Sequence, residues 1–216
     1  MKKYLKKYIK RIVLCGLCFI MAFSIMSAKP TAVMAKVKMP AKSETLVKRI
    51  SDYTTLYIVE HPKKAWTKIS INNDTIMKAA DLTICHYENK NCFDSEKQIH
   101  NLCYKYFGKP GYKDVTKGDH FYYLDGKIYN YGGDWGMSWP ECRNVKKKKI
   151  KSGVYDVYVT NYMRYDKDAL EPGEKELEKA GESIVRIKKN NKSAFGYVVI
   201  GMKYKTTDKK WFRLYS

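Results

Sequence analysis

The sequence contains no apolar run long enough to cross a bilayer. Its uncharged apolar stretch, Ile12 to Met26, covers about 15 residues, whereas a membrane-spanning helix needs roughly 20. We therefore expect no permanent membrane anchor. The stretch instead follows a cluster of basic side chains, which is the order of a secretory signal peptide: Lys2, Lys3, Lys6, Lys7, Lys10 and Arg11.

The small residues Val33 and Ala35 fit a cleavage site. They predict a signal peptide over residues 1–35 and a mature chain that starts at Lys36, with retention of the signal as the alternative. The charges of this presequence are all basic, but the chain carries +20 in total and stays strongly basic after their removal. We expect a protein that is secreted, extracellular or associated with the cell wall.

Motifs of known enzyme classes are also missing. The chain has no nucleotide-binding loop, no GxSxG turn and no protease Cys–His signature. His120 follows Asp119 at the start of a predicted strand, but neighbours in a strand point to opposite faces and are poorly placed to bond each other. These absences favour a non-enzymatic protein with no cofactor.

Four cysteines follow the predicted signal: Cys85, Cys92, Cys103 and Cys142. An even number in an exported chain predicts one or two disulfides, with three full pairings open; buried free thiols are the alternative. Zinc ligation by these residues with His86 and His100 has weak support because no CxxC pair occurs, so we expect no metal.

The first half of the mature chain predicts three helices after a flexible start at 36–42. Ser43 begins the first, which His61-Pro62 ends; the second covers 74–88; and Ser95 begins the third, which Gly108 ends. Their apolar residues repeat at three and four positions, so each helix needs a sheet to cover. The helical part therefore spans 43–108.

After Pro110-Gly111, apolar residues recur at every second position, which is the pattern of a strand. Asp125-Gly126 predicts a hairpin, and further strands are expected over 142–150, 154–165, 183–188, 194–205 and 211–215. Residues 166–182 are rich in acids and are expected to form a solvated loop with a short helix. The sheet part, 118–216, completes a single α+β domain of helices on a curved antiparallel sheet of five to seven strands.

Two short motifs and the element order carry a resemblance to known proteins. Gly133-Asp-Trp-Gly136 and Phe195-Gly-Tyr-Val-Val199 resemble small exported proteins of unknown function from Gram-positive anaerobes. The order of helices and strands is similar to the nuclear-transport-factor-type or cystatin-like α+β cone. This resemblance implies a fold and supplies no catalytic residues.

The richest candidate for ligand binding is the segment from Tyr131 to Glu141. Its glycines allow tight turns, and its aromatic rings could stack on a sugar or a peptide. Structural plugging of the core by the tryptophans is the alternative. The candidate ligand-binding residues are Tyr131, Asp134, Trp135, Trp139 and Glu141.

A second candidate is the basic run of Lys146, Lys147, Lys148, Lys149 and Lys151. Lysines on an edge strand prevent sheet extension, and a basic patch also attracts polyanions. We therefore favour a binding domain for an anionic wall polymer or glycan, with nucleic acid not expected in an exported setting. The alternative is a secreted hydrolase that uses Asp134 and Glu141 on a glycan.

Overall fold

The computed structural model describes residues 40–88, 92–131, 138–170 and 172–207. These residues belong to one compact unit, Lys36–Ser216, of the α+β class that the sequence predicts. The predicted signal peptide and the terminal strand at 211–215 lie outside the described residues. Among the helices that are described, none combines the length and the apolar character needed to cross a membrane.

The first helix, α2 (Ala41–Glu60), begins slightly before the predicted Ser43 and ends at His61, as predicted. The Ser43 hydroxyl does not cap the helix but donates to the Pro40 carbonyl at 2.8 Å. Leu46, Val47 and Ile50 are fully buried, because their spacing places them on one side of the helix.

The second helix, α3 (Asn73–Thr83), is capped by Asn72 and continues as a π-helical turn, η1 (Ile84–Glu88). The third, α4 (Glu96–Phe107), ends at the predicted Gly108, whose φ of 66° is readily adopted by glycine. Ser95 precedes this helix as its N-cap residue, but its side chain makes no capping bond. Gln98 instead accepts a bond from the backbone N–H of Asp94 at 3.1 Å.

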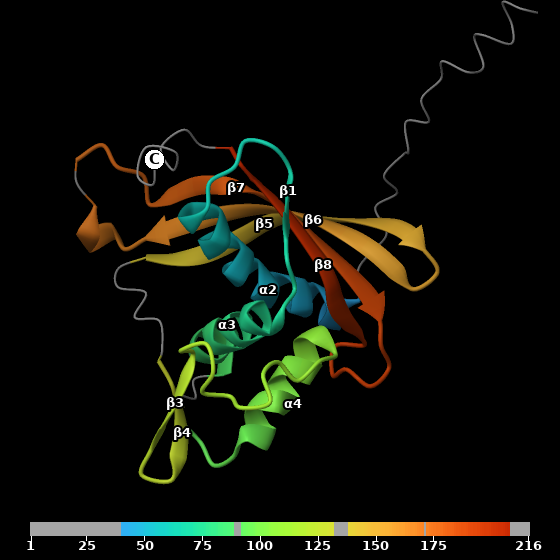
Figure 1. Ribbon diagram of the computed structural model, residues 1–216. Helices are drawn as coiled ribbons and strands as arrows, with labels where there is room; N and C mark the ends of the chain where they lie inside the picture. Colours follow the sequence, from blue (N-terminus) through green and yellow to red (C-terminus); the bar gives the residue numbers. More distant parts are fainter. Residues whose placement is uncertain (1–39, 89–91, 132–137, 171, 208–216) are drawn as a thin grey trace, which may run out of the picture. The chain divides into compact units, whose positions relative to one another are not determined.

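The main sheet has five antiparallel strands in the order β1-β8-β7-β6-β5 (Figure 1). Their bounds are β1 Thr67–Ile69, β5 Ser138–Lys151, β6 Val154–Tyr165, β7 Leu177–Lys189 and β8 Tyr197–Thr206. A separate three-stranded sheet, in the order β2-β4-β3, contains β2 Cys92–Phe93, β3 Phe121–Leu124 and β4 Lys127–Asn130. The hairpin predicted at Asp125-Gly126 joins β3 to β4.

The acidic segment at 166–182 is only partly the loop that its composition predicts. A short 3-10 helix, η2 (Lys167–Ala169), lies there, but β7 already begins at Leu177. The many charged residues of this segment predict a loop, but the segment also contains Ala180 and Gly181, which the strand places in the core. A Cβ at Gly181 would lie 2.3 Å from the Lys205 carbonyl oxygen, so glycine is needed where β7 meets β8.

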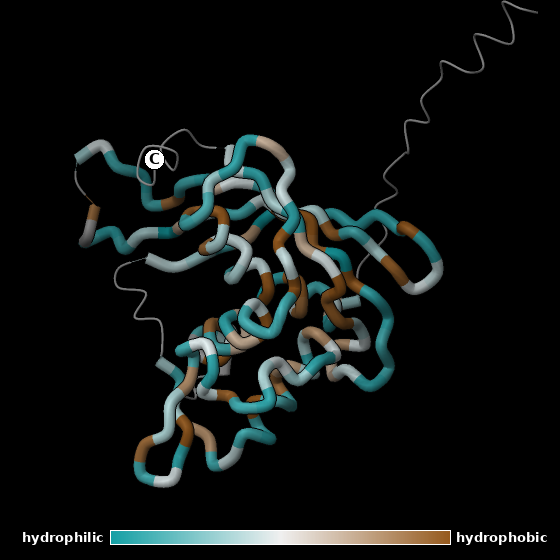
Figure 2. The backbone as a smooth tube through the Cα atoms, in the orientation of Figure 1, coloured by the Kyte–Doolittle hydropathy of each residue, from teal (hydrophilic) through white to brown (hydrophobic). Residues whose placement is uncertain are grey.

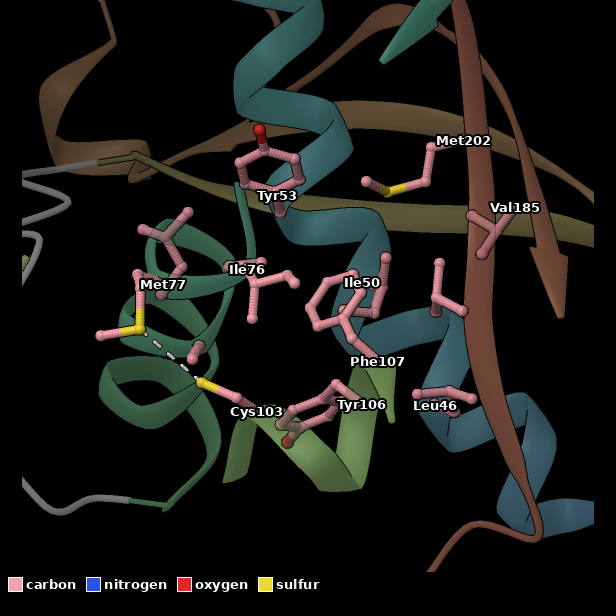
Figure 3. Packing of buried hydrophobic residues seen from close by; sticks show 14 of the residues in the cluster. Leu46, Ile50, Tyr53, Ile76, Met77, Cys103, Tyr106, Phe107, Val185 and Met202 are labelled. Atoms are coloured by element: carbon pink, nitrogen blue, oxygen red, sulfur yellow. Dashed lines mark hydrogen bonds between the residues drawn. The ribbon is translucent and has the colours of Figure 1, made fainter. Parts of the chain in front are cut away.

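One face of the main sheet packs on α2, which contacts β5, β6, β7 and β8. Figure 3 shows Leu46 and Ile50 of α2 and Val185 of β7 within one cluster of buried side chains. The α4 side chains Tyr106 and Phe107 join the same cluster, and hydrophobic residues concentrate in this region (Figure 2).

The alternation of residues 154–165 predicts that Tyr155, Val157, Val159 and Met163 are buried against the third helix. The burial of Val157, Val159 and Met163 on β6 is confirmed, with Tyr155 half-buried. The predicted neighbour is wrong, however. The helix on β6 is α2, while α4 packs on β8 and α3, because the long first helix occupies the centre of the sheet.

Candidate functional site

We call the side of the main sheet opposite α2 the outer face. Opposed residues of antiparallel strands share a face, so the register defines its members. Asp156 opposes Lys148 on one side and Arg186 on the other. The cationic members are Lys68, Arg143, Lys146, Lys148, Lys151, Arg164, Lys179, Arg186, Lys188, Lys203 and Lys205, against the acids Glu141, Asp156 and Glu182.

Each acid of the outer face already has a cationic partner. Arg186 holds Asp156 with two bonds of 2.6 and 2.8 Å. Lys179 and Lys205 hold Glu182 at 3.1 and 2.9 Å. Several outer-face lysines remain, and these form no ion pair with any described residue: Lys68, Lys146, Lys148, Lys151, Lys188 and Lys203. The face therefore keeps uncompensated positive charge.

The predicted basic run lies on β5, which is an edge strand of the sheet. Its register divides the run between the two faces. Lys146, Lys148 and Lys151 oppose outer-face residues of β6. Lys147 and Lys149 belong to the other face, where the Lys147 ammonium lies 4.1 Å from the Tyr155 ring centroid. The run therefore protects an edge and also contributes to the cationic face, but it does not form one patch by itself.

A groove of about 240 Å³ runs across the middle of the outer face. Lys68, Arg186 and Lys203 line it together with the apolar side chains Ile184 and Ile200 and with Asp156, which Arg186 holds. Ile200 is turned outward by a bulge in β8 and is 44% exposed. Basic and apolar side chains in one groove suit a ligand that carries both anionic groups and a carbon body.

Aromatic rings accompany the basic side chains on this face. Tyr162 lies 5.6 Å from the Arg143 guanidinium, and the exposed Trp66 lies 5.1 Å from the Lys205 ammonium. Trp139 opposes Arg164 on the same face. Flat rings of this kind stack on sugar rings.

The predicted ligand-binding segment is divided between the two sheets. Tyr131 follows β4 in the three-stranded sheet, is 59% exposed and lies 4.9 Å from Tyr122. Trp139 and Glu141 lie on β5 of the main sheet. Asp134 and Trp135 lie outside the described residues. Among the described candidate residues of this segment, Trp139 and Glu141 belong to the outer face.

Glu141 is placed to hold arginines and not to donate a proton. Its carboxylate accepts from Arg143 and Arg164, each at 2.6 Å. Partial burial pushes the pKa of Glu141 upward, but the bonds and charges of the two guanidiniums outweigh burial and hold the pKa below its usual range. The residue therefore stays ionised, whereas a glycosidase acid must be protonated.

The predicted disulfides are not formed by Cys92, Cys103 or Cys142, which are all free thiols. They lie on different elements with different neighbours. Cys103 packs 3.9 Å from the Met77 sulfur, and burial raises its pKa to about 12. Burial likewise raises the pKa of Cys142 to about 11, beside Ser51 and Asp52. Such thiols are poor nucleophiles at neutral pH.

The sequence did not predict a pair formed by Asp52 of α2 and His86 of η1. Asp52 Oδ2 lies 2.7 Å from His86 Nδ1, and the carboxylate is almost fully buried. Burial raises the pKa of Asp52, and the bond to Asp52 raises the pKa of His86. The sequence does contain one sign of this pair, because Asp52 lies among the apolar positions of the first helix.

The other histidines have structural partners. His120 Nε2 lies 3.1 Å from Asp74 Oδ1, so Asp74 is its carboxylate partner, not the adjacent Asp119. His100 Nδ1 donates to the Pro110 carbonyl at 3.0 Å. In the part of the chain that the structure describes, no three His, Cys, Asp or Glu side chains gather into a group that could hold a metal ion.

Comparisons with known proteins found no matching family model, no matching curated protein and no matching solved structure. The resemblance to exported Gram-positive proteins and to the cone fold therefore stays a prediction.

Proposed function

We propose that this protein is an exported, non-enzymatic domain that binds an anionic polymer across the outer face of its main sheet. The unpaired lysines Lys68, Lys146, Lys148 and Lys203 carry this proposal, because they lie on three strands, β1, β5 and β8, of one face of the sheet. A cationic surface of this extent attracts a chain of negative charges more strongly than a single ion.

The aromatic residues of the face favour a polymer that contains sugar rings. Trp66, Trp139 and Tyr162 lie among the cations and supply stacking surfaces. An anionic wall polymer or glycan meets both requirements, and it occurs outside the cell where we expect this protein. The hydrolase alternative lacks a proton donor in Glu141, because Arg143 and Arg164 hold that carboxylate ionised.

The test is retention on an immobilised anionic glycan, with heparin as the probe, across a salt gradient. The face variant changes Lys68, Lys146, Lys148 and Lys203 to Gln. Contacts between lysines and a polyanion release counterions, by roughly 0.7 to 0.9 ions per contact on nucleic acids. We therefore expect the face variant to bind about 10- to 100-fold more weakly at low salt and to show a flatter dependence on salt.

The matched control removes the same charge elsewhere. Lys97, Lys113, Lys117 and Lys127 are exposed lysines of α4, the following loop and β4, and the control changes them to Gln. Exposed lysines contribute little to stability, so both variants should fold. Equal elution of the face and control variants would show that retention follows net charge alone and would refute a site on the outer face.

A further inference from the structure

A second and larger cavity, which we call the tip pocket, lies where the end of α4 meets the turn between β7 and β8. Its volume is about 570 Å³. Its lining residues are Phe107, Gly108, Lys109, Lys188, Lys189, Asn190, Asn191, Lys192, Val198 and Ile200. Ile200 also lines the groove of the outer face, so the two cavities adjoin at this residue.

The lining of the tip pocket is cationic without any acid. Lys109, Lys188, Lys189 and Lys192 all line it, and none of them forms an ion pair with a residue that the structure describes. Four positively charged residues therefore border one cavity, and their combined charge would attract an anion.

The Asn190 side chain adds a neutral donor. Its Oδ1 accepts from the backbone N–H of Lys192 at 3.0 Å, which fixes the orientation of the amide. Its Nδ2 consequently lies near Gly108, where an added Cβ would be 3.5 Å away, and donates to no group in the described ranges. The amide therefore offers a free N–H donor within the pocket lining.

The turn that carries these groups is held in place before any ligand binds. Asn190 N–H donates to the Gly196 carbonyl at 2.9 Å, and Ser193 Oγ donates to the Lys105 carbonyl of α4 at 2.8 Å. The Phe195 ring packs 5.4 Å from that of Tyr106. A fixed turn loses little conformational entropy on binding, which favours affinity.

The pocket also has an apolar part, formed by Phe107, Val198 and Ile200. Phe107 and Val198 are buried, and Ile200 is half-exposed. Lysine is a common phosphate ligand that acts as a point charge, and a phosphate ester offers several acceptor oxygens to the ammonium and amide donors. The attached carbon body would cover the apolar part.

We propose that the tip pocket binds a phosphate ester with an attached carbon body. The inference rests on the proposed function, since it makes this pocket the place where one phosphate-bearing unit of the polymer, or its end, is recognised. The outer face then contributes charge along the rest of the chain, and the pocket contributes selectivity for phosphate.

The test uses hexyl phosphate as a small probe, titrated at low salt and followed by calorimetry. The pocket variant changes Lys109, Lys188, Lys189 and Lys192 to Gln, and the face and control variants serve as matched comparisons. We expect the pocket variant to bind hexyl phosphate at least 10-fold more weakly, whereas the face and control variants bind it as the wild type does. Circular dichroism checks that every variant is folded.

A second variant, Ile200→Asn, tests the apolar part without a change of charge. This variant should bind hexyl phosphate more weakly than the wild type does, but it should bind inorganic phosphate with unchanged affinity. The wild type should bind hexyl sulfate more weakly than hexyl phosphate. Vesicles of phosphatidylglycerol, compared with phosphatidylcholine, distinguish a lipid source of the ester from a soluble one; binding to either source supports the pocket if the pocket variant loses it.

The outcomes separate the two proposals. If hexyl phosphate does not bind, or binds the wild type and the pocket variant equally, the tip pocket is refuted even where heparin retention depends on the outer face. If the face variant keeps full heparin retention while the pocket variant loses hexyl phosphate, the polymer proposal fails and the pocket is a separate small-molecule site.

Discussion

Replacing His86 with Ala is expected to lower the free energy of unfolding by about 2 to 3 kcal/mol at pH 6, because a hydrogen bond to a buried charged group is lost. His86 Nδ1 lies 2.7 Å from Asp52 Oδ2, and the Asp52 side chain is only 2% exposed. Without the imidazole, the carboxylate must take up a proton or remain buried without its histidine partner. Urea unfolding of the wild type and the variant measures the difference.

The same pair predicts how stability depends on pH. Burial raises the pKa of Asp52, and the bond to Asp52 raises that of His86, so the folded protein binds both protons more tightly than the unfolded chain does. A raised pKa stabilises the fold at low pH. The contribution of His86 is complete below about pH 6.5, the value for an unfolded histidine, and is lost as the pH rises through the folded pKa.

Asp52→Asn provides the comparison, since it keeps the shape of the carboxyl group and removes its charge. We expect Asp52→Asn and His86→Ala to flatten the decline of stability above pH 6.5. His61→Gln is the control, because His61 is exposed and has no carboxylate partner within the described part of the chain. A wild-type melting midpoint that rises between pH 6 and 8, with no such rise in Asp52→Asn, would contradict the assignment.

Asn161→Ala is expected to cost about 2 to 4 kcal/mol of stability, because buried polar groups lose their partners and a cavity forms. Asn161 is fully buried on β6. Its Nδ2 donates to the Ser183 hydroxyl at 2.9 Å, and its Oδ1 lies 3.1 Å from the Thr55 hydroxyl of α2. This residue therefore ties two strands to the central helix through polar contacts within the core.

Thr160→Ala is the control on the same strand, since Thr160 is half-buried on the outer face. It should cost less than about 1 kcal/mol, the span of strand propensities. Chemical unfolding followed by far-UV circular dichroism compares the two variants with the wild type. An Asn161→Ala protein within about 0.5 kcal/mol of the wild type would show that the network contributes nothing net.

The regular parts of the fold could be predicted because each carries a local signal. The spacing of Leu46, Val47 and Ile50 marks a helical face, Gly108 marks a helix end, and Asp125-Gly126 marks a hairpin. The beginning of β7 could not be predicted in this way. Its acid Glu182 pairs with Lys205 of β8 as well as with Lys179 of the same strand, so part of its stabilisation comes from a neighbour that is distant in sequence.

The sequence predicts the positive charge of the candidate site but not which side chains share one face of the sheet. The lysine run was visible, but its division between two faces follows from the β5 register and the bulge between Arg143 and Lys146. Lys68 and Lys203 carry no local signal at all, and only the pairing of β1 with β8 places them together. The pairing of His86 with Asp52 likewise depends on contacts between distant segments.

The most direct test of the outer face is a map of where an anionic glycan binds. A heparin tetrasaccharide added to the ¹⁵N-labelled domain, residues 36–216, should shift the backbone amide signals of β5 to β8, with the largest shifts around Lys148, Arg186 and Lys203. These shifts should shrink as salt is added, because the contacts are electrostatic. Shifts confined to α4 and the β3–β4 hairpin, or no shifts at low salt, would contradict a polymer-binding outer face.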